Sequence, residues 1–364
     1  MATLVGMVLL RPGEQERNLG DLARIQSEFD AVVDAAESGP CGGDELLCFF
    51  FTVRLLEGRH RGETREIELP GSPSTPDLRP GDKVVLAYEP TAESGSEYYF
   101  FDRQRKPTLF WLAVVFSVAV VALGRLRGFA ALGGLAVTLL LLLSFVIPSI
   151  LSGNSPVLVA IVGAAAITFA TLYLAHGFSH KTTVALLGTL VSLGLTALLT
   201  EIFVGLAQLS GYVSDEATIL NLESSAIDIG GLVLAGVIIG ALGALDDVTV
   251  TQASAIWELK AANVQFGASD LFRSGLRIGR DHIASTVNTL LLAYAGASMP
   301  LLLFFAVSEQ SLASVANQEI VATEIIRTLV GSIGLVASVP ITTALAARVV
   351  ASARNPAGSP RKGQ

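Results

Sequence analysis

The sequence predicts an α-helical membrane bundle of about seven transmembrane helices, preceded by an extracytoplasmic, β-rich domain resembling a small barrel. Two observations support this fold class. The chain is 51% hydrophobic and only 15% charged, whereas soluble domains carry about 25% charged residues. The deficit of charge lies almost wholly after residue 107. We therefore expect a β-rich domain at 1–106, a transmembrane domain at 107–352 and a basic, disordered cytoplasmic tail at 353–364.

The first forty residues predict one strand and one helix. Thr3–Leu10 is apolar, is too short to span a membrane and follows no basic segment, so it indicates a strand rather than a signal peptide. Glu14–Glu37 is polar and carries apolar residues at helical spacing. This pattern predicts an amphipathic helix that ends at the SGPCGG stretch.

The next sixty residues predict a hairpin and two further strands. Leu46–Leu56 is β-branched and aromatic, Glu57–Glu63 supplies the turn, and the alternating segment TREIEL follows. The segments LRPGDKVVLAYEP and SEYYFFD each predict one more strand. About five strands and one helix indicate a small barrel or open sheet. With no ligand-type cluster in it, the domain is interpreted as a stabilising cap, with a partner-binding module as the alternative.

Charge and cysteine content exclude several classes of protein. The net charge of −8 argues against nucleic-acid binding, which requires a basic face. Two cysteines, Cys41 and Cys48, are too few for a disulfide scaffold or a cysteine zinc site. Two reduced thiols are the favoured interpretation, and a single bridge is the alternative if the segment is extracytoplasmic.

Seven apolar stretches follow the β-rich domain, and most reach the roughly 20 residues that a spanning helix needs. They cover 109–124, 129–150, 156–176, 182–206, 229–247, 282–306 and 326–349. Pro340 predicts a break near the middle of the last stretch, and Glu324 with Arg327 predicts an ion pair where that stretch opens.

The loops predict the orientation. Cations gather in alternate connections, at Gly124–Gly128, His176–Lys181, Lys260–Arg280 and the C-terminal tail. Because cationic loops remain in the cytoplasm, we expect the N-terminal domain outside a bacterial inner membrane and the C-terminus in the cytoplasm. An exported domain needs an export signal, so we also expect a span ahead of the present first residue.

Two segments place polar side chains at or inside the ends of apolar stretches, where such groups suggest function. In Gly240–Leu259 one helix face carries Asp247, Thr251, Ser254 and Glu258. In Gly279–Gly296 one face carries Asp281, Ser285 and Asn288. We expect both stripes to begin near the cytoplasmic ends of their spans and to face one another.

Asp246 and Asp247 are the central pair of the first segment. Two adjacent carboxylates in a low-dielectric site cannot easily both ionise, so one becomes a proton carrier. The alternative is that these aspartates cap a helix at the membrane interface. His176 and His180 lack a third ligand, and no nucleophile–base, phosphate-loop or metalloprotease motif is present. We therefore expect no enzyme activity, no metal and no cofactor.

Four motifs together resemble the YibE/F family of bacterial polytopic membrane proteins. They are HGFSHKTTVALLGTL, GALGALDDVTVTQASAIWEL, GRDHIASTVNTLLLAYAG and EIIRTLVGSIGLVASVPITTALAA. The resemblance covers most of the chain from about Arg54 onward and implies an extracytoplasmic β domain placed after a first span. Members of this family are mostly described as candidate transporters, so the resemblance implies no substrate.

A looser similarity concerns the order of the polar segments. An apolar span, an Asp-Asp pair, a hydroxyl-rich helix and a Thr/Asn-rich span occur in the same order in resistance–nodulation–division transporters and their SecD/SecF relatives. In those families the span with carboxylates relays protons, which the similarity implies here for Asp246 and Asp247 only. An extra pair of spans and a small outer domain separate this chain from that pattern.

The expected function is proton- or cation-coupled export of an unknown substrate, with the bilayer and a small ion or solute as partners and a homo-oligomer left open. The alternative is a non-transporting scaffold or regulator whose outer domain binds a partner. The residues expected to couple ions are Asp246, Asp247 and Asp281. The residues expected to line a polar path are Thr249, Thr251, Gln252, Ser254, Ser285, Thr286, Asn288 and Thr289.

Overall fold

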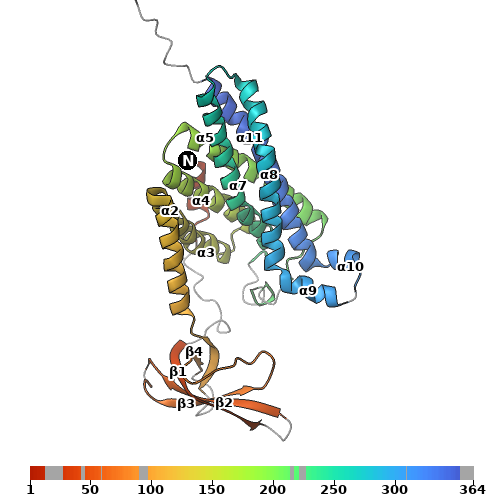
Figure 1. Ribbon diagram of the computed structural model, residues 1–364. Helices are drawn as coiled ribbons and strands as arrows, with labels where there is room; N and C mark the ends of the chain where they lie inside the picture. The colour runs from red at the N-terminus through yellow and green to blue at the C-terminus, as the bar shows by residue number, and fades with distance from the viewer. Residues whose placement is uncertain are drawn as a thin grey trace, which may run out of the picture. The chain divides into compact units, whose positions relative to one another are not determined.

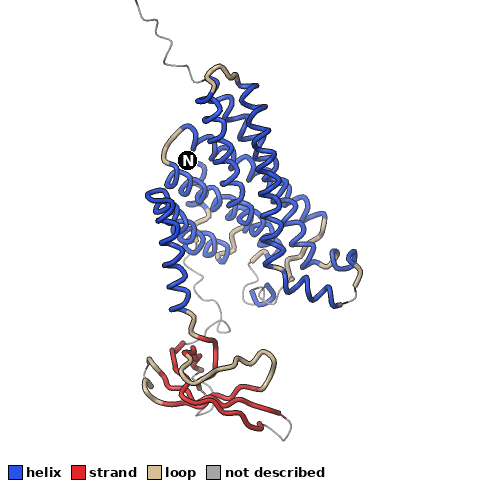
Figure 2. Tube along the Cα trace, viewed as in Figure 1, coloured by secondary structure: helices blue, strands red, loops and turns tan. Residues whose placement is uncertain are grey.

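The computed structural model describes residues 1–12, 28–41, 46–58, 60–89, 97–213, 217–220, 227–308 and 310–352. The chain forms two compact units, Leu19–Ala119 and a second made of Met1–Asn18 with Val120–Gln364. The first unit contains a β-sheet and the second is a helical bundle (Figures 1 and 2). The predicted fold class is therefore confirmed, whereas the first residues of the chain group with the helices rather than with the sheet.

Five antiparallel strands form the β unit, in the order β3-β2-β1-β4-β5. They are β1 (Glu28–Cys41), β2 (Leu46–Leu55), β3 (Thr64–Pro70), β4 (Lys83–Tyr88) and β5 (Tyr98–Arg103). The two edge strands β3 and β5 also contact each other, so the sheet curls into a half-barrel. Ala31, Val33, Leu55, Val84 and Leu86 are almost fully buried inside it. The predicted hairpin and the two later strands are confirmed.

Strand β1 corrects the predicted amphipathic helix. Residues 28–37 are extended, and the earlier part of Glu14–Glu37 lies outside the described residues. Ala31 and Val33 alternate into the core, and β1 pairs with both β2 and β4. Helical spacing in the sequence loses to this pairing because two remote strands satisfy the backbone of β1 on both sides.

An irregularity in β1 brings a charged pair together across the sheet. The register with β2 shifts between Val33 and Ala35. The Arg54 guanidinium donates from Nε and Nη2 to the two carboxylate oxygens of Asp34, each at 2.9 Å. This two-pronged contact lowers the pKa of Asp34 below its usual range. The pair is exposed, so it fixes geometry more than it adds stability.

The cysteines differ from the favoured expectation of reduced thiols. Cys48 takes part in a disulfide bond, and Cys41 is the other cysteine of the chain. Both belong to the β1–β2 hairpin, where Cys48 pairs with Gly39 and Cys41 with Leu46. Disulfide bonds persist in oxidising compartments.

The N-terminal strand prediction is wrong, because Ala2–Leu9 forms helix α1. Its apolar run has no alternation, and a helix satisfies its own backbone hydrogen bonds beside apolar neighbours. Gly6 lets α1 approach α4 closely, since a Cβ there would lie 2.8 Å from a methyl carbon of Val162. At the end of α1, the Ser149 hydroxyl donates to the Leu10 carbonyl at 2.7 Å.

Helix α2 (Lys106–Leu141) divides sharply at Arg125, whose φ of 51° is not helical. Beyond the division, Gly128 approaches the Val120 carbonyl so closely that a Cβ would lie 2.3 Å from the oxygen. A π-helical turn η2 (Leu142–Val146) and the short α3 (Ile147–Leu151) complete this segment. The predicted stretches 109–124 and 129–150 are thus two helical pieces within one continuous segment.

The rest of the bundle consists of long helices and two short ones. They are α4 (Pro156–His176), α5 (His180–Leu206), α7 (Ile229–Ala262), α8 (Ala268–Ala297), α9 (Met299–Val307), α10 (Leu312–Ala316) and α11 (Glu319–Ser352). Among the described residues, five helices are long and apolar enough to cross a membrane, or six if the bent pair α8–α9 forms one span. The protein is therefore a membrane protein with slightly fewer candidate spans than the sequence suggests.

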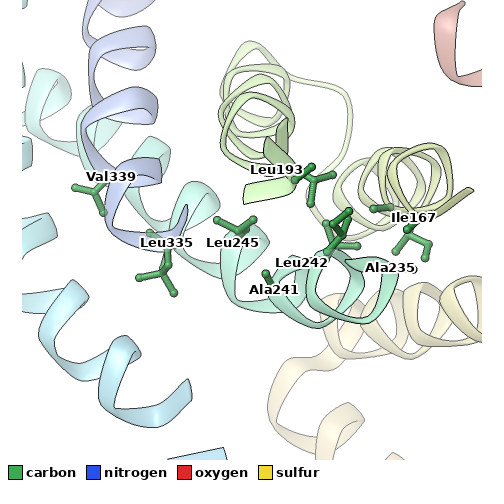
Figure 3. Packing of buried hydrophobic residues seen from close by; sticks show 13 residues of the cluster. Ile167, Leu193, Ala235, Ala241, Leu242, Leu245, Leu335 and Val339 are labelled. Atoms are coloured by element: carbon green, nitrogen blue, oxygen red, sulfur yellow. The ribbon is translucent and has the colours of Figure 1, made fainter. Parts of the chain in front are cut away.

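Helix α7 is the centre of the bundle. It packs against α4, α5, α8 and α11, and α5, α7, α8 and α11 run side by side in Figure 1. Ile238, Leu245 and Val248 of α7 are completely buried. Figure 3 shows Leu245 between Leu193 of α5 and Leu335 of α11. Because α7 is surrounded on several sides, its position fixes which side chains of its neighbours face inward.

Glycines facing hydroxyl side chains bring α5 and α11 into close contact. A Cβ on Gly188 would lie 2.2 Å from Thr342 Oγ1, and a Cβ on Gly334 would lie 1.9 Å from Thr196 Oγ1. Small residues allow this approach in membrane bundles, where packing replaces the hydrophobic drive between helices. The predicted break at Pro340 is wrong, since α11 continues through it as one helix.

At the opposite end of α5, a carboxylate joins two helices. Glu319, the first residue of α11, accepts hydrogen bonds from the Ser210 hydroxyl at 2.9 Å and from the Gly211 amide at 2.7 Å. Gly211 in turn lies against the backbone of Ile229, where α7 begins. The Glu324–Arg327 pair also forms, at 2.6 Å, within α11 rather than at its start.

We predict that Gly334→Ala destabilises the bundle by about 1–3 kcal/mol, the usual cost of overpacking a core. The added methyl group would overlap the Thr196 hydroxyl. Gly194→Ala on α5 is the matched control, because nothing lies within 4 Å of its Cβ position. The measurement is an SDS unfolding titration in mixed micelles. Thr196→Ala should restore much of the loss, and equal stability of the two glycine variants would contradict the contact.

Candidate functional site

A carboxyl group is buried between three helices of the bundle. Asp246 of α7 has one carboxylate oxygen, Oδ1, fully buried and without a hydrogen-bond partner among the described residues. The hydroxyls of Thr168 on α4 and Thr189 on α5 lie beside this carboxyl group. Thr189 and Thr249 share a hydrogen bond of 2.7 Å, and Thr249 also donates to the Asp246 carbonyl at 3.2 Å. We call these four residues the Asp246 cluster.

The cluster lies deep along the neighbouring helices. Thr168 is about 18 Å from Pro156 and about 12 Å from His176, the two ends of α4, at 1.5 Å per residue. Helix α4, at about 31 Å, matches a hydrocarbon layer of about 30 Å. Thr189 lies about 13 Å from His180, where α5 begins. Asp246 is therefore not at the membrane interface, which was the alternative suggested by the sequence.

The chemistry of the cluster is that of an acid among neutral oxygen groups. The three threonines are fully buried, and in the described part of the chain no cationic side chain pairs with Asp246. Thr168 Oγ1 also lacks a hydrogen-bond partner there. An unpaired carboxylate at such depth is costly, so a bound proton or a bound cation stabilises it. Carboxylate and hydroxyl oxygens are suitable ligands for either.

Asp247 lies on a different side of α7 and does not join the cluster. Its side chain is 69% exposed, and its Oδ2 lies 3.9 Å from Nε2 of His282 on α8. Consecutive residues on a helix point about 100° apart. The two aspartates therefore do not form the proton-sharing pair that the sequence suggests, although each keeps its predicted role as a hypothesis.

The second predicted stripe does not face the first. On α8, Asp281, Ser285, Asn288 and Thr289 are exposed, and Thr286 is half-buried. The hydroxyls of Thr286 and Thr289 donate to carbonyls one turn earlier in their own helix. The structure therefore separates an inward site on α7 from an outward polar face on α8.

Gln252 joins helices rather than lining a path. Its Nε2 donates to the Gly275 carbonyl of α8 at 2.8 Å and to Thr343 Oγ1 of α11 at 2.7 Å. Gly275 and Gly279 both pack against Gln252 so closely that a Cβ at either would approach its amide within 3.3 Å or less. Thr251 is exposed, and Ser254 is half-buried in a small hollow beside His176 and Lys181.

Thr168 and Thr189 are the site residues that sequence reasoning missed. A signal for Thr189 is present in the apolar stretch 182–206, where hydroxyl residues recur at helical spacing. The buried members are Thr182, Thr189, Ser192, Thr196 and Thr200. Such a stripe on an otherwise apolar span indicates an inward face. Thr168 has no comparable pattern around it.

Comparison with known families covers the helical unit. A family model for YibE/F-like protein matches residues 112–352. The chain belongs to this family. The YibE/F-like region contains every predicted site residue and leaves out the five strands. No curated protein matches the chain, and no solved structure does.

A second hollow of this YibE/F-like protein lies between α8, α9 and α11. It has a volume of about 240 Å³ and is lined mainly by apolar side chains, including Leu291, Leu302 and Ile325. Tyr294 and Glu324 are its polar members, and Glu324 is paired with Arg327. This hollow is separate from the Asp246 cluster.

We predict that Gln252→Leu lowers the stability of the bundle by about 1–2 kcal/mol, because a buried carbonyl and hydroxyl each lose a donor. Ser254→Ala on the same helix is the control, since its side chain is only half-buried. Both variants are compared with wild type by SDS titration. If Gln252→Leu unfolds like the control, the amide does not hold the helices together.

Proposed function

We propose that this YibE/F-like membrane protein is a transporter coupled to protons or another cation, with Asp246 as the coupling group. The observation that supports this is an unpaired carboxyl group surrounded by hydroxyls, about 12 Å inside the end of α4. Groups of this kind in membrane spans are rare and typically lie on ion or proton pathways. In this proposal the protein is not an enzyme.

Coupling requires that the carboxyl group change its charge during the transport cycle. In the present state Asp246 is screened from solvent by α4 and α5, and its buried oxygen favours the proton-bound or cation-bound form. An opening of α7 away from α4 would hydrate the carboxylate and release the ion. The same carboxyl group then alternates between two environments, which is the physical requirement for coupling.

We also propose that the β domain is extracytoplasmic and that the bacterial inner membrane holds the bundle. Within the bundle, Lys181, Lys260, Arg273 and Arg348 lie at one end, at or near the α4–α5 turn, the α7–α8 connection and the end of α11. Asp228 and Glu319 lie at the other end. Positive loops stay in the cytoplasm, and the disulfide of Cys48 supports an oxidising environment for the β domain.

The coupling proposal predicts a charge displacement that depends on Asp246. Purified protein in liposomes on a solid-supported membrane is exposed to pH jumps and, at fixed pH, to sodium jumps. Wild type should give a transient current with one of the two ions because binding moves charge into the bundle. Asp246→Asn should lose that current, whereas Asp247→Asn should keep it because Asp247 is exposed.

Two controls keep this test decisive. Size-exclusion profiles and unfolding titrations establish that both variants fold. Thr168→Val, which keeps the shape of a buried side chain but removes its hydroxyl, should shift the pH or sodium dependence of the current. A wild type without any current, together with an Asp246→Asn variant that is altered only in stability, would favour the scaffold alternative and overturn the coupling proposal.

The orientation predicts opposite results for two fusions in a bacterial host. Alkaline phosphatase inserted at Gly71, in the loop after β3, should be active because that enzyme needs the oxidising side of the membrane. A green fluorescent protein attached after residue 364 should fluoresce in the cytoplasm. The reverse pair of results would invert the proposed topology.

A further inference from the structure

The outward face of α8 is polar over about three turns. Arg277, Asp281, Ser285 and Asn288 are exposed and lie at helical spacing, with Thr289 beside them. On α7 the exposed Asp247 and Thr251 continue this surface, since Asp247 lies 3.9 Å from His282 of α8. We call this surface the α8 polar face.

Packing contacts place most of this face at membrane depth. The Gly275 carbonyl binds Gln252 of α7, and Ser254, half a turn further along α7, lies at the α4–α5 turn beside His176. From Gly275, Ser285 is about 15 Å and Asn288 about 20 Å further along α8. The helix continues to Ala297, about 33 Å from Gly275. Ser285 and Asn288 therefore lie near the middle of the layer that α8 crosses.

The bundle cannot turn this face inward. Gly275 and Gly279 are buried against α7 and α11, where a Cβ on either would lie 2.3 Å from Ile256 or Val339. Rotating α8 to bury Asn288 would replace these glycines by larger side chains at the same contact. The opposite face of α8 is thus fixed by close packing, and the polar face stays directed away from α7 and α11.

Hydrocarbon is an unsuitable neighbour for such a surface. Intramembrane carboxylates and amides almost always face the interior of a bundle or a water-filled cavity. The other exposed helix faces of the bundle are apolar, as at Leu158 of α4, Val191 of α5 and Ile333 of α11. The contrast between these faces and α8 shows that α8 alone is built for a polar neighbour.

We propose that the α8 polar face binds the same face of a second copy of this chain, forming a two-fold dimer. The groups on it are self-complementary. Serine, threonine and asparagine side chains both donate and accept hydrogen bonds, so identical surfaces can pair. Arg277 and Asp281, one turn apart, provide both charges. In a two-fold pair about the membrane normal, a shift of about 6 Å along α8 aligns the arginine of one copy with the aspartate of the other.

This dimer would place Asp247 and His282 at its border, next to the second copy. Asp247 would then exchange exposure to lipid for exposure to protein, which removes the cost of an intramembrane carboxylate facing hydrocarbon. The Asp246 cluster lies within one copy, between α4, α5 and α7. The dimer therefore goes beyond the coupling proposal and does not depend on it.

Cysteine cross-linking in native membranes tests the dimer. Ser285→Cys and Asn288→Cys should form covalent dimers on oxidation with copper phenanthroline, because a two-fold axis brings identical positions together. Val191→Cys is the matched control: its side chain is 52% exposed at a comparable depth on α5. Wild type, with its two native cysteines, sets the background. Equal cross-linking of Val191→Cys and Asn288→Cys would overturn the proposal.

A second measurement quantifies the association. Single-molecule photobleaching in liposomes gives the dimer fraction at increasing lipid dilution. The triple variant Ser285→Leu, Asn288→Leu and Thr289→Leu should weaken dimerisation about 20-fold, from the average worth of three interhelical hydrogen bonds in membranes. Val191→Leu should leave it unchanged. A wild type that bleaches in one step at every dilution would show that the face is covered in another way, and the proposal would fail.

Discussion

Close packing of helix backbones in the bundle decides the inward or outward direction of every polar side chain. Gly188 and Gly334 hold α5 and α11 together over hydroxyl groups, and Gly275 and Gly279 hold α8 against α7 and α11. Each of these contacts fixes the rotation of a helix about its own axis. In a bilayer, where helix association gains little from hydrophobicity, such contacts determine the arrangement.

Two chemically similar segments therefore have different environments. The carboxyl group of Asp246 is enclosed by α4 and α5, whereas Asp247, its neighbour in sequence, lies on the outer surface beside His282. The hydroxyls of α5 are buried, whereas those at Ser285 and Thr289 of α8 are exposed. An isolated buried acid suits ion binding, and a broad polar surface suits association with another polar surface. The two proposals made for this protein follow from that division.

Local patterns predicted those parts of the fold that depend on neighbouring residues. The β2–β3 hairpin follows from its turn chemistry, and the spans follow from their length and apolarity. Strand β1 could not be predicted in this way, because Ala31 and Val33 are buried by strands more than twenty residues away in sequence. Helix α1 is similar, since a short apolar run is compatible with either state until its neighbour α4 is known.

The candidate site was predicted only in part, for the same reason. The sequence identifies the Asp-Asp pair as unusual but draws the polar stripe through Asp247, Thr251 and Ser254. The buried side of this segment is instead formed by Asp246, Thr249 and Gln252. Both sides of the segment are polar, so periodicity alone cannot tell which one faces α4 and α5. Only the packing partners, Thr168 among them, decide it.

The Glu319 contact at the far end of α5 has a consequence for how this family can vary. Gly211 touches the backbone of Ile229, so the connection between α5 and α7 leaves and re-enters the bundle at one point. Its length does not set the spacing of the two helices. Because the entropy of closing a loop grows only slowly with its length, residues could be gained or lost between 212 and 228 without disturbing the helices around Asp246.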